Sequence, residues 1–138
     1  MKASILLDTC AAIYIMENEW MRPAAVVAID EASDRDEKVF VSPITAWEIG
    51  MLSAKGRFKS SHAPRRWWDL LLARRQIGLT DMLPQLLLES PWLPGNLHRD
   101  PADRIIAATA REYGLTVMTR DRALLDYAQE GHLSALEC

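Results

Sequence analysis

Short apolar runs alternate along this chain with longer segments that carry helical signals. The runs occupy 4–7, 39–41 and 116–119, and each ends at or next to a polar residue. Continuous rather than alternating apolar runs are typical of strands buried on both faces, as in a parallel sheet. Two more short strands are expected, one near Leu79 and one over 133–136 at a sheet edge.

The segments between these runs predict helices. Ser42 is placed to cap a helix that begins at Pro43 and ends near Gly56. From Pro101 to Gly114, apolar residues recur at the spacing of a helix that packs on a core. Further helices are expected over 9–16, from Pro23 to about Glu31, over 67–76 with a stop at Gly78, over 83–89 and from Asp121, with a loop over 91–101. Strands alternating with helices predict an α/β layer structure with right-handed crossovers.

Length and composition limit the class of protein. A chain of 138 residues fits one domain over 1–138, and its 49% hydrophobic and 25% charged residues are ordinary for a globular protein. The net charge of -3 gives no overall attraction to nucleic acid, so binding of an anionic polymer needs local patches or metal ions. Cys10 and Cys138 sit at opposite ends of the sequence, without a Cys-x-x-Cys pair or companion histidines at ligand spacing, so neither a structural disulfide nor a zinc site is expected and a reducing compartment fits best. Asp8 interrupts the leader-like start, and no stretch is apolar enough to span a membrane, so a cytoplasmic protein is expected.

Four acidic residues fall at strand ends or in early helical turns. Asp8 ends the first strand and Asp121 follows the strand over 116–119, and each can also be the N-cap of the next helix. Glu48 interrupts an otherwise apolar helix face, where burial of a carboxylate costs several kcal/mol unless a cation or donors compensate. Asp103 lies in a first helical turn, where it can serve the helix dipole or pair with a neighbouring arginine. Asp100 is the natural N-cap before Pro101, and whether it also ligates a metal stays open.

The predicted topology brings these four acids toward one edge of one sheet. In an open parallel sheet, ligands bind beyond the carboxyl ends of the strands. Four carboxylates at close quarters stay ionised only with positive charge between them, and no lysine occurs at these junctions. A divalent cation is the remaining solution, and an all-oxygen ligand set favours Mg²⁺ or Mn²⁺ over zinc. Such a site suits hydrolysis of phosphodiester bonds.

The chain resembles the PIN-domain ribonucleases, and in particular the VapC-type toxins of bacterial type II toxin-antitoxin systems. The resemblance rests on four stretches in the family's order, ILLDTCAAIYI, SPITAWEIGMLSAKGR, HRDPADRIIAATARE and LTVMTRDRALLDY. It implies a PIN-like three-layer α/β/α sandwich with a central, mainly parallel sheet. It also implies Mg²⁺- or Mn²⁺-dependent endoribonuclease activity that hydrolyses tRNA or another structured RNA and so blocks translation.

The resemblance assigns roles residue by residue. Asp8 and Asp103 are expected to ligate the metal directly, and Glu48 and Asp121 to complete the catalytic site directly or through water. Thr9 and Thr119 are expected to be hydroxyls that orient carboxylate, water or phosphate. A bulky residue often stands in the family where this chain has Ala102, which changes the pocket shape but removes no ligand. The resemblance further implies inhibition by a VapB-type antitoxin, a homodimer and larger toxin-antitoxin assemblies.

The basic residues are segregated along the chain. The segment 55–75 holds seven of the sixteen basic residues and one acid, Asp69. It can contact RNA phosphates or be an ordinary solvated helix face. Five of its members are named as RNA-binding candidates: Lys55, Arg57, Lys59, Arg65 and Arg66.

The aromatic residues and histidines receive mostly structural interpretations. Trp67 and Trp68 are expected in the core or a partner interface, with base stacking or an antitoxin groove as alternatives. Trp20, Trp47 and Trp92 are expected to pack in the interior. The histidines are scattered, which speaks against a metal-free ribonuclease, and His98 is expected to be structural.

Two other classes of function compete with the nuclease. A signalling receiver domain needs paired acids after the first strand and a lysine after the last, and neither pattern is apparent in the sequence. A noncatalytic PIN-like module would bind RNA or protein without cutting, and the presence of all four acids argues against it.

Overall fold

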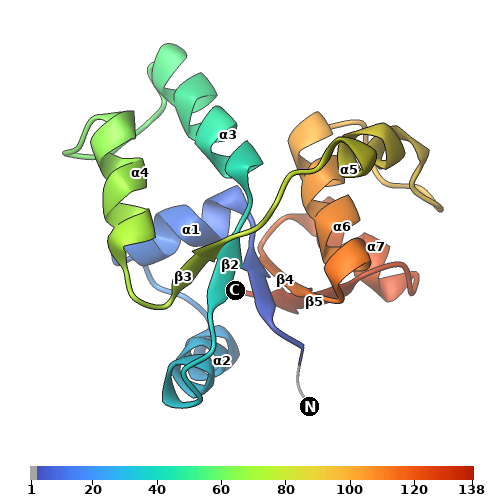
Figure 1. Cartoon of the computed structure of the whole chain (residues 1–138), viewed down its shortest axis with the longest axis horizontal. Helices are drawn as coiled ribbons and strands as arrows, with labels where there is room; N and C mark the ends of the chain where they lie inside the picture. Colours follow the sequence, from blue (N-terminus) through green and yellow to red (C-terminus); the bar gives the residue numbers. More distant parts are fainter. Residues whose placement is uncertain (1–2) are drawn as a thin grey trace.

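A five-stranded, fully parallel sheet forms the centre of the computed structural model, which describes residues 3–138 (Figure 1). Its order is β3-β2-β1-β4-β5. The strands are β1 (Ile5–Leu7), β2 (Val39–Val41), β3 (Ile77–Leu79), β4 (Thr116–Thr119) and β5 (Ser134–Glu137). The expected parallel α/β architecture, with an edge strand at the end of the chain, is therefore confirmed.

Helices fill the connections, and local sequence fixes where most of them begin. They are α1 (Thr9–Met16), α2 (Pro23–Asp34), α3 (Pro43–Ala54), α4 (Pro64–Ala73), α5 (Pro84–Glu89), α6 (Pro101–Tyr113) and α7 (Arg122–Gln129), with the 3₁₀ turn η1 (Ser90–Trp92). Five of them start at a proline, whose fixed φ suits the first helical position. Ser42 caps α3 by accepting a hydrogen bond from the backbone N of Ile44 at 3.1 Å. Gly114, at a φ of 65°, ends α6 in the left-handed conformation that glycine tolerates best.

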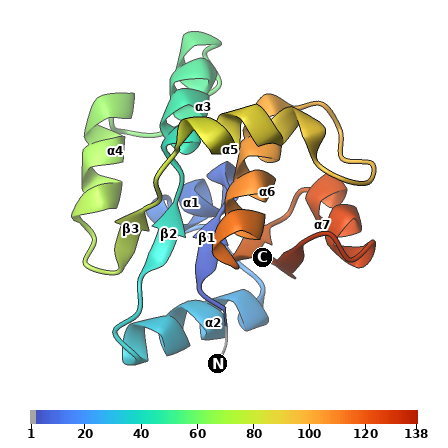
Figure 2. The ribbon, with the colours of Figure 1, turned by 45° about the vertical axis from the view of Figure 1, so that its right-hand side comes forward.

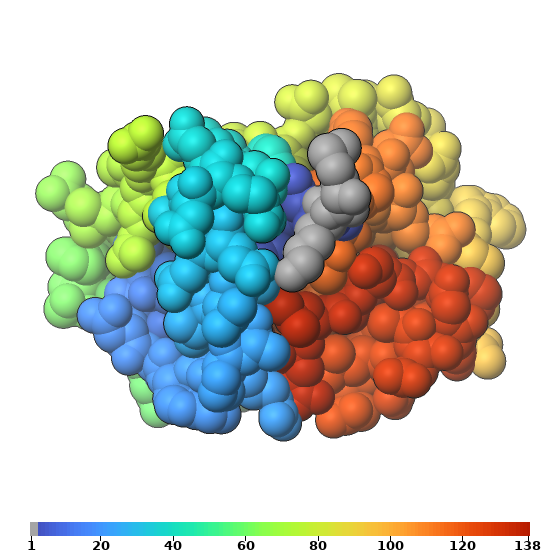
Figure 3. Space-filling view, turned by 90° about the horizontal axis from the view of Figure 1, so that it is seen from below, coloured from blue at the N-terminus to red at the C-terminus, as the bar shows by residue number. Residues whose placement is uncertain are grey.

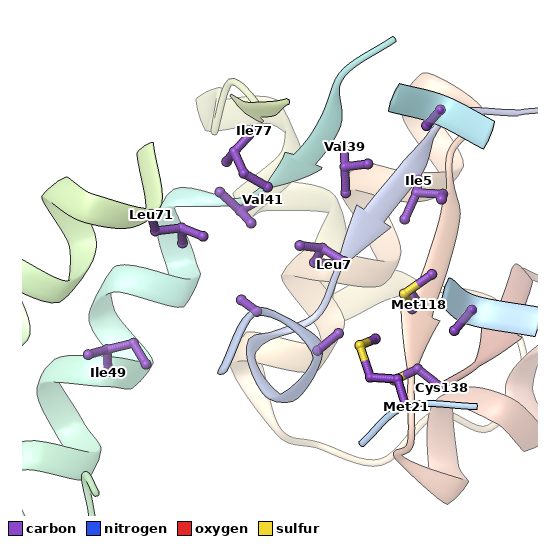
Figure 4. Packing of buried hydrophobic residues seen from close by; sticks show 14 of the residues in the cluster. Ile5, Leu7, Met21, Val39, Val41, Ile49, Leu71, Ile77, Met118 and Cys138 are labelled. Atoms are coloured by element: carbon purple, nitrogen blue, oxygen red, sulfur yellow. The ribbon is translucent and has the colours of Figure 1, made fainter. Parts of the chain in front are cut away.

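Helices flank the two faces of the sheet (Figure 2), and a cluster of buried apolar side chains lies on each face. Successive strand residues point to opposite faces, so Ile5 and Leu7 join one cluster and Leu6 joins the other. The first cluster packs against α1, α2 and α4, and Figure 4 shows its buried side chains, with Ile49 and Leu71 among them. The second cluster packs against α6 and α7. The molecule is therefore the three-layer α/β/α sandwich that the family resemblance implies.

The helix predicted over 67–76 is wrong at both ends. Helix α4 starts earlier, at Pro64, whose fixed φ suits the first helical position, and it ends at Ala73, because the backbone of Arg74 is extended. Gly78 does not stop a helix but lies inside β3, opposite Phe40 of β2. A Cβ at this position would lie 3.0 Å from the Phe40 ring, so glycine allows the close approach of the two strands.

The tryptophans differ in burial, and only part of the sequence expectation for them holds. Trp67 is fully buried, and its indole donates a hydrogen bond to Glu17 at 3.1 Å, which confirms a core position. The packing role predicted for three others is wrong, since Trp20 is 70% exposed, Trp47 53% and Trp92 85%. Their local sequence does not reveal this, because exposure depends on which elements pack nearby.

The carboxyl end of the chain lies beside the start of α2, as the space-filling view shows (Figure 3). The backbone N of Arg22 donates to the carbonyl oxygen of Cys138 at 2.9 Å, and the Arg22 guanidinium pairs with Glu137 at 2.5 Å. Cys10 and Cys138 are free thiols. Within residues 3–138, no helix has the length and apolar character needed to cross a membrane.

Candidate functional site

The predicted site lies at the switch point of the sheet. After β1 the chain builds β2 and β3 on one side, and later β4 and β5 on the other. Ligands of open parallel sheets bind at such a point, beyond the carboxyl ends of the strands. Asp8 directly follows β1 and Asp121 follows the adjacent β4, so both stand at this edge.

Asp8 serves as a helix cap and as a pocket acid at the same time. Its Oδ1 accepts from the backbone N of Ala11 at 2.8 Å, and its Oδ2 accepts from the hydroxyl of Thr119. The residue is only 3% exposed. Burial raises the pKa of Asp8 to about 6, the charge of Asp121 adds to the rise, and the hydrogen bonds from Thr119 and the backbone oppose it. The structural and the functional interpretation of Asp8 are therefore compatible.

Glu48 reaches the same region from the middle of α3. The Thr9 hydroxyl donates to its Oε1, and the hydroxyl oxygens of Thr9 and Thr45 lie 3.2 Å apart. Burial raises the pKa of Glu48, and the negative charges of Asp100 and Asp8 raise it further. Thr9 and Thr119 thus each donate a hydrogen bond to one of these carboxylates.

Asp103 and Asp121 both approach the same nitrogen of the His98 ring. The Nε2 atom of His98 lies 3.1 Å from Asp103 Oδ2 and 3.4 Å from Asp121 Oδ2. Burial raises the pKa of Asp103 to about 7, with further contributions from the charges of Asp100, Asp121 and Glu48. Asp121 also caps α7, because its Oδ2 accepts from the backbone N of Leu124 at 3.0 Å.

Asp100 acts as the predicted N-cap of α6. Its Oδ1 accepts from the backbone N of Ala102 at 3.0 Å and of Asp103 at 3.4 Å. Its charge reaches both Glu48 and Asp103, so it belongs to the electrostatic surroundings of the site. Asp100 therefore contributes negative charge from a capping position.

His98 is the site residue that the sequence interpretation misses. The guanidinium of Arg104 fixes the loop before α6, since it donates to the carbonyl oxygens of His98 at 2.9 Å and Leu97 at 2.7 Å. This loop holds the imidazole over the first turn of α6 and against Asp121. The one sequence signal was that His98 precedes the Asp100-Pro101 helix start. Its proximity to Asp121, 23 residues later, follows only from the fold.

The thiol of Cys10 lies within reach of the charges of all four acids. Burial raises the pKa of its thiol to about 12, and the charges of Asp8, Glu48, Asp103 and Asp121 all contribute. The acids come from four separate elements of the chain, at β1, α3, α6 and α7. The structure thus brings Asp103 and Asp121 together with His98, and it places Asp8 and Glu48 near enough for their charges to act on the same thiol.

The donor set fits a divalent cation. Ligand atoms of His98, Asp103 and Asp121 all lie within 4.8 Å of one another. Carboxylates whose ionised forms are disfavoured by burial and by each other gain stability from a bound cation. Oxygen ligands suit Mg²⁺ and Mn²⁺, whereas the imidazole nitrogen widens the range toward zinc and nickel. His98 therefore adds one candidate nitrogen ligand to the expected oxygen ligands.

The basic candidates lie away from the strand ends, on the connection from α3 to α4. Lys55 is the C-cap residue of α3, and Arg65 and Arg66 lie in the first turn of α4. Lys55, Arg57, Lys59, Arg65 and Arg66 are all exposed. They are accessible to the phosphate backbone of a nucleic acid, but their positions alone do not identify a binding partner.

Comparisons with known proteins agree with this fold. The family model described as "PIN domain" matches residues 5–130. Ribonuclease VapC22 of Mycobacterium tuberculosis is 31% identical over 123 residues, which cover 88% of this chain and 89% of that protein.

Solved structures show the same fold at lower identity. A DNA-bound VapBC structure from Salmonella typhimurium superposes with a TM-score of 0.65 at 20% identity, covering 99% of this chain and 98% of that one. VapBC2 from Rickettsia felis, bound to a promoter DNA fragment, gives a TM-score of 0.66 at 15% identity over 96% of this chain and 97% of that one. The family match and the VapC22 identity extend over most of the sequence, and the motifs that carry the four acids fall inside the matched range. The chain therefore belongs to the PIN-domain family and is homologous to the VapC ribonuclease toxins of VapBC toxin-antitoxin systems.

Proposed function

We propose that this protein is a metal-dependent endoribonuclease that acts as the toxin of a type II toxin-antitoxin system. The observation that carries the proposal is the convergence of Asp8, Glu48, Asp103 and Asp121, with the pKa of Asp8 raised to about 6 and that of Asp103 to about 7. Mutual repulsion between negative charges at one sheet edge destabilises the fold, and it is typical of a site that binds a cation.

Each site residue has a distinct role in this proposal. Asp8 and Asp103 would hold Mg²⁺ or Mn²⁺ directly, and Glu48 and Asp121 would complete the site directly or through water. The hydroxyls of Thr119 and Thr9 fix the orientations of Asp8 and Glu48 through the hydrogen bonds that they donate. A divalent ion in this place lowers the pKa of a bound water and stabilises negative charge on a phosphate. The carboxylates are held before substrate arrives, so little reorganisation is needed during the reaction.

The proposed substrate is tRNA or another structured RNA with accessible single-stranded nucleotides, and its cleavage blocks translation. The exposed residues Lys55, Arg57, Lys59, Arg65 and Arg66 would contact phosphates away from the scissile bond. Such contacts raise affinity without reading sequence.

The proposed partner is a cognate VapB-type antitoxin. Next to Glu48, Pro43, Ile44 and Trp47 of α3 line an apolar groove with Met82 and Pro101. A groove of this kind accepts an apolar peptide segment that covers the acidic site. The exposed side chains of Leu87 and Leu88 on α5 are available for a homodimer contact, and larger assemblies form when the antitoxin joins two dimers. We place the protein in the cytoplasm, where its RNA substrates are.

The decisive experiment is an RNA cleavage assay with purified protein. Cleavage of tRNA and of looped RNA is measured with Mg²⁺, with Mn²⁺ and with excess chelator. Asp103→Asn removes one site carboxylate and is expected to slow cleavage by at least roughly a hundredfold. The matched control is Asp126→Asn, which removes the same charge from the exposed face of α7 and should leave the rate unchanged.

Three outcomes separate the alternatives. Cutting that needs metal and Asp103 supports the proposal. RNA binding without cutting under any metal condition would instead establish a noncatalytic binding module. Cutting that persists in the chelator would remove the metal from the mechanism.

A further inference from the structure

An aromatic and cationic cluster stands beside the acids and has no part in holding them. The guanidinium carbon of Arg120 lies 4.0 Å from the centroid of the Tyr14 ring and 5.9 Å from that of the Trp20 ring. The same guanidinium donates a hydrogen bond to the backbone carbonyl of Trp20. Arg120 therefore fixes the turn between α1 and α2 and presents both rings around one positive charge.

The chain places this cluster immediately next to the acidic site. Arg120 stands between Thr119, which donates to Asp8, and Asp121, which contacts His98. Tyr14 lies one turn after Cys10 on α1, on the same helix face. Cys10 in turn feels the charges of all four site acids. One helical turn of α1 thus separates Tyr14 from a residue that lies within reach of the acidic charges.

The fold leaves surface of both Arg120 and Trp20 available for a ligand. Trp20 is 70% exposed, although an aromatic ring of its size gains substantially from burial. Among the described residues, no ion pair of Arg120 is found, and the guanidinium contacts two ring faces, one carbonyl oxygen and the polar side-chain atoms of Tyr14 and Cys138. The cluster therefore offers an open ring surface and a partly unused guanidinium within an acidic protein.

We propose that Trp20 and Arg120 form a nucleotide-binding subsite for single-stranded RNA beside the scissile position, in which Trp20 stacks on a base and Arg120 contacts a phosphate of the same strand. This inference rests on the proposed ribonuclease function and adds a site that holds the strand next to the cleaved bond. Every nucleobase has a ring face, so stacking on Trp20 accepts any sequence. Arg120 counters the repulsion between the RNA backbone and the nearby carboxylates.

Binding measurements on a protein that cannot cut provide the test. In the Asp8→Asn background, affinity for a short fluorescein-labelled single-stranded RNA is measured in Mg²⁺ over a series of salt concentrations. Trp20→Ala is expected to weaken binding roughly 5- to 150-fold, the usual loss for one stacked base, while the salt dependence stays the same. Arg120→Ala is expected to weaken binding and also to reduce the log-log salt slope by about 0.7, the value for one phosphate contact on a single strand.

Matched variants separate a binding role from a structural one. Trp92→Ala removes an even more exposed tryptophan, on η1, and should leave RNA affinity unchanged. Trp20→Phe keeps a stacking ring and should recover most of the affinity. Thermal unfolding of each variant reports whether the turn between α1 and α2 is damaged.

The outcomes also distinguish this inference from the function on which it rests. If the wild-type protein cuts RNA but Trp20→Ala binds RNA as well as Trp92→Ala does, the subsite is overturned and the ribonuclease stands. If Trp20→Ala keeps its RNA affinity and loses only affinity for an antitoxin, the cluster is a protein contact and the subsite is again overturned. If the wild-type protein neither binds nor cuts RNA, both proposals fail.

Discussion

Replacing Asp8 with asparagine should stabilise the metal-free protein near pH 8, although it removes a residue of the proposed active site. The Asp8 carboxylate is 3% exposed and lies near another negative charge, that of Asp121. Its pKa of about 6 in the folded protein, against an ordinary value of 3.8, means that folding disfavours the ionised form. Asparagine has nearly the same shape without the charge.

The sign and the size of the effect follow from the two pKa values of Asp8. Because the pKa is raised by folding, the folded protein binds more protons than the unfolded chain between pH 3.8 and about 6. The free energy of unfolding therefore falls as pH rises through this window, and the loss is complete above it. The difference between the two values corresponds to about 3 kcal/mol.

The substitution does not recover all of this energy. The asparagine Oδ1 can still accept from the backbone N of Ala11, but the hydroxyl of Thr119 loses a charged acceptor. That loss costs about 1 kcal/mol, which leaves a net stabilisation of about 2 kcal/mol. For a chain of this length the gain corresponds to a rise in Tm of roughly 5–10 °C.

Unfolding by heat and by urea, at pH 8 and at pH 4 and with excess chelator, measures the effect. The stabilisation by Asp8→Asn should be present at pH 8 and absent at pH 4, where the carboxyl is protonated in the folded state. Saturating Mg²⁺ or Mn²⁺ should raise the Tm of the wild-type protein and have little effect on Asp8→Asn. Equal destabilisation of Asp8→Asn at both pH values would refute the reasoning, since it would show that the carboxylate carries no charge penalty. Asp126→Asn on the exposed face of α7 controls for net charge.

Three further predictions concern other parts of the molecule. His98→Ala should lower the affinity for Zn²⁺ at least tenfold and leave the affinity for Mg²⁺ no weaker, both measured by calorimetry. The reason is that the imidazole beside Asp103 and Asp121 offers the nitrogen ligand that zinc prefers. An equal loss of Mg²⁺ affinity would contradict this. Trp67→Ala should destabilise the fold by about 3–5 kcal/mol in urea, since it empties a fully buried site, whereas Trp92→Ala should change stability by less than about 0.5 kcal/mol. Cys10 should react slowly with iodoacetamide at pH 8, because its pKa of about 12 leaves little thiolate. Mg²⁺ should speed this reaction by neutralising the acids, and mass spectrometry can follow the rate. Ordinary reactivity of Cys10 without metal would argue against the clustered negative charge.

The sequence by itself determined the parts of this protein that depend on local chemistry. The Ser42-Pro43 and Asp100-Pro101 pairs start α3 and α6 where they are predicted, because capping and proline geometry act within a few residues. The unbroken apolar runs locate three of the strands for a similar reason, since burial on both faces leaves no room for polar residues. Together with the family motifs, these signals place Asp8, Glu48, Asp103 and Asp121 at one sheet edge.

Only the tertiary structure decided the features that depend on distant residues. Gly78 lies in a strand rather than after a helix because Phe40, in another part of the sequence, requires the space above it. His98 belongs to the site because its ring contacts Asp121. Trp20 stays exposed beside Arg120, which lies 100 positions later in the sequence. Contacts between residues so far apart in the sequence leave no periodic or local signal, since chain folding and not spacing brings them together. The acids could therefore be located from the sequence, whereas the surroundings that set their pKa values and their neighbours could not.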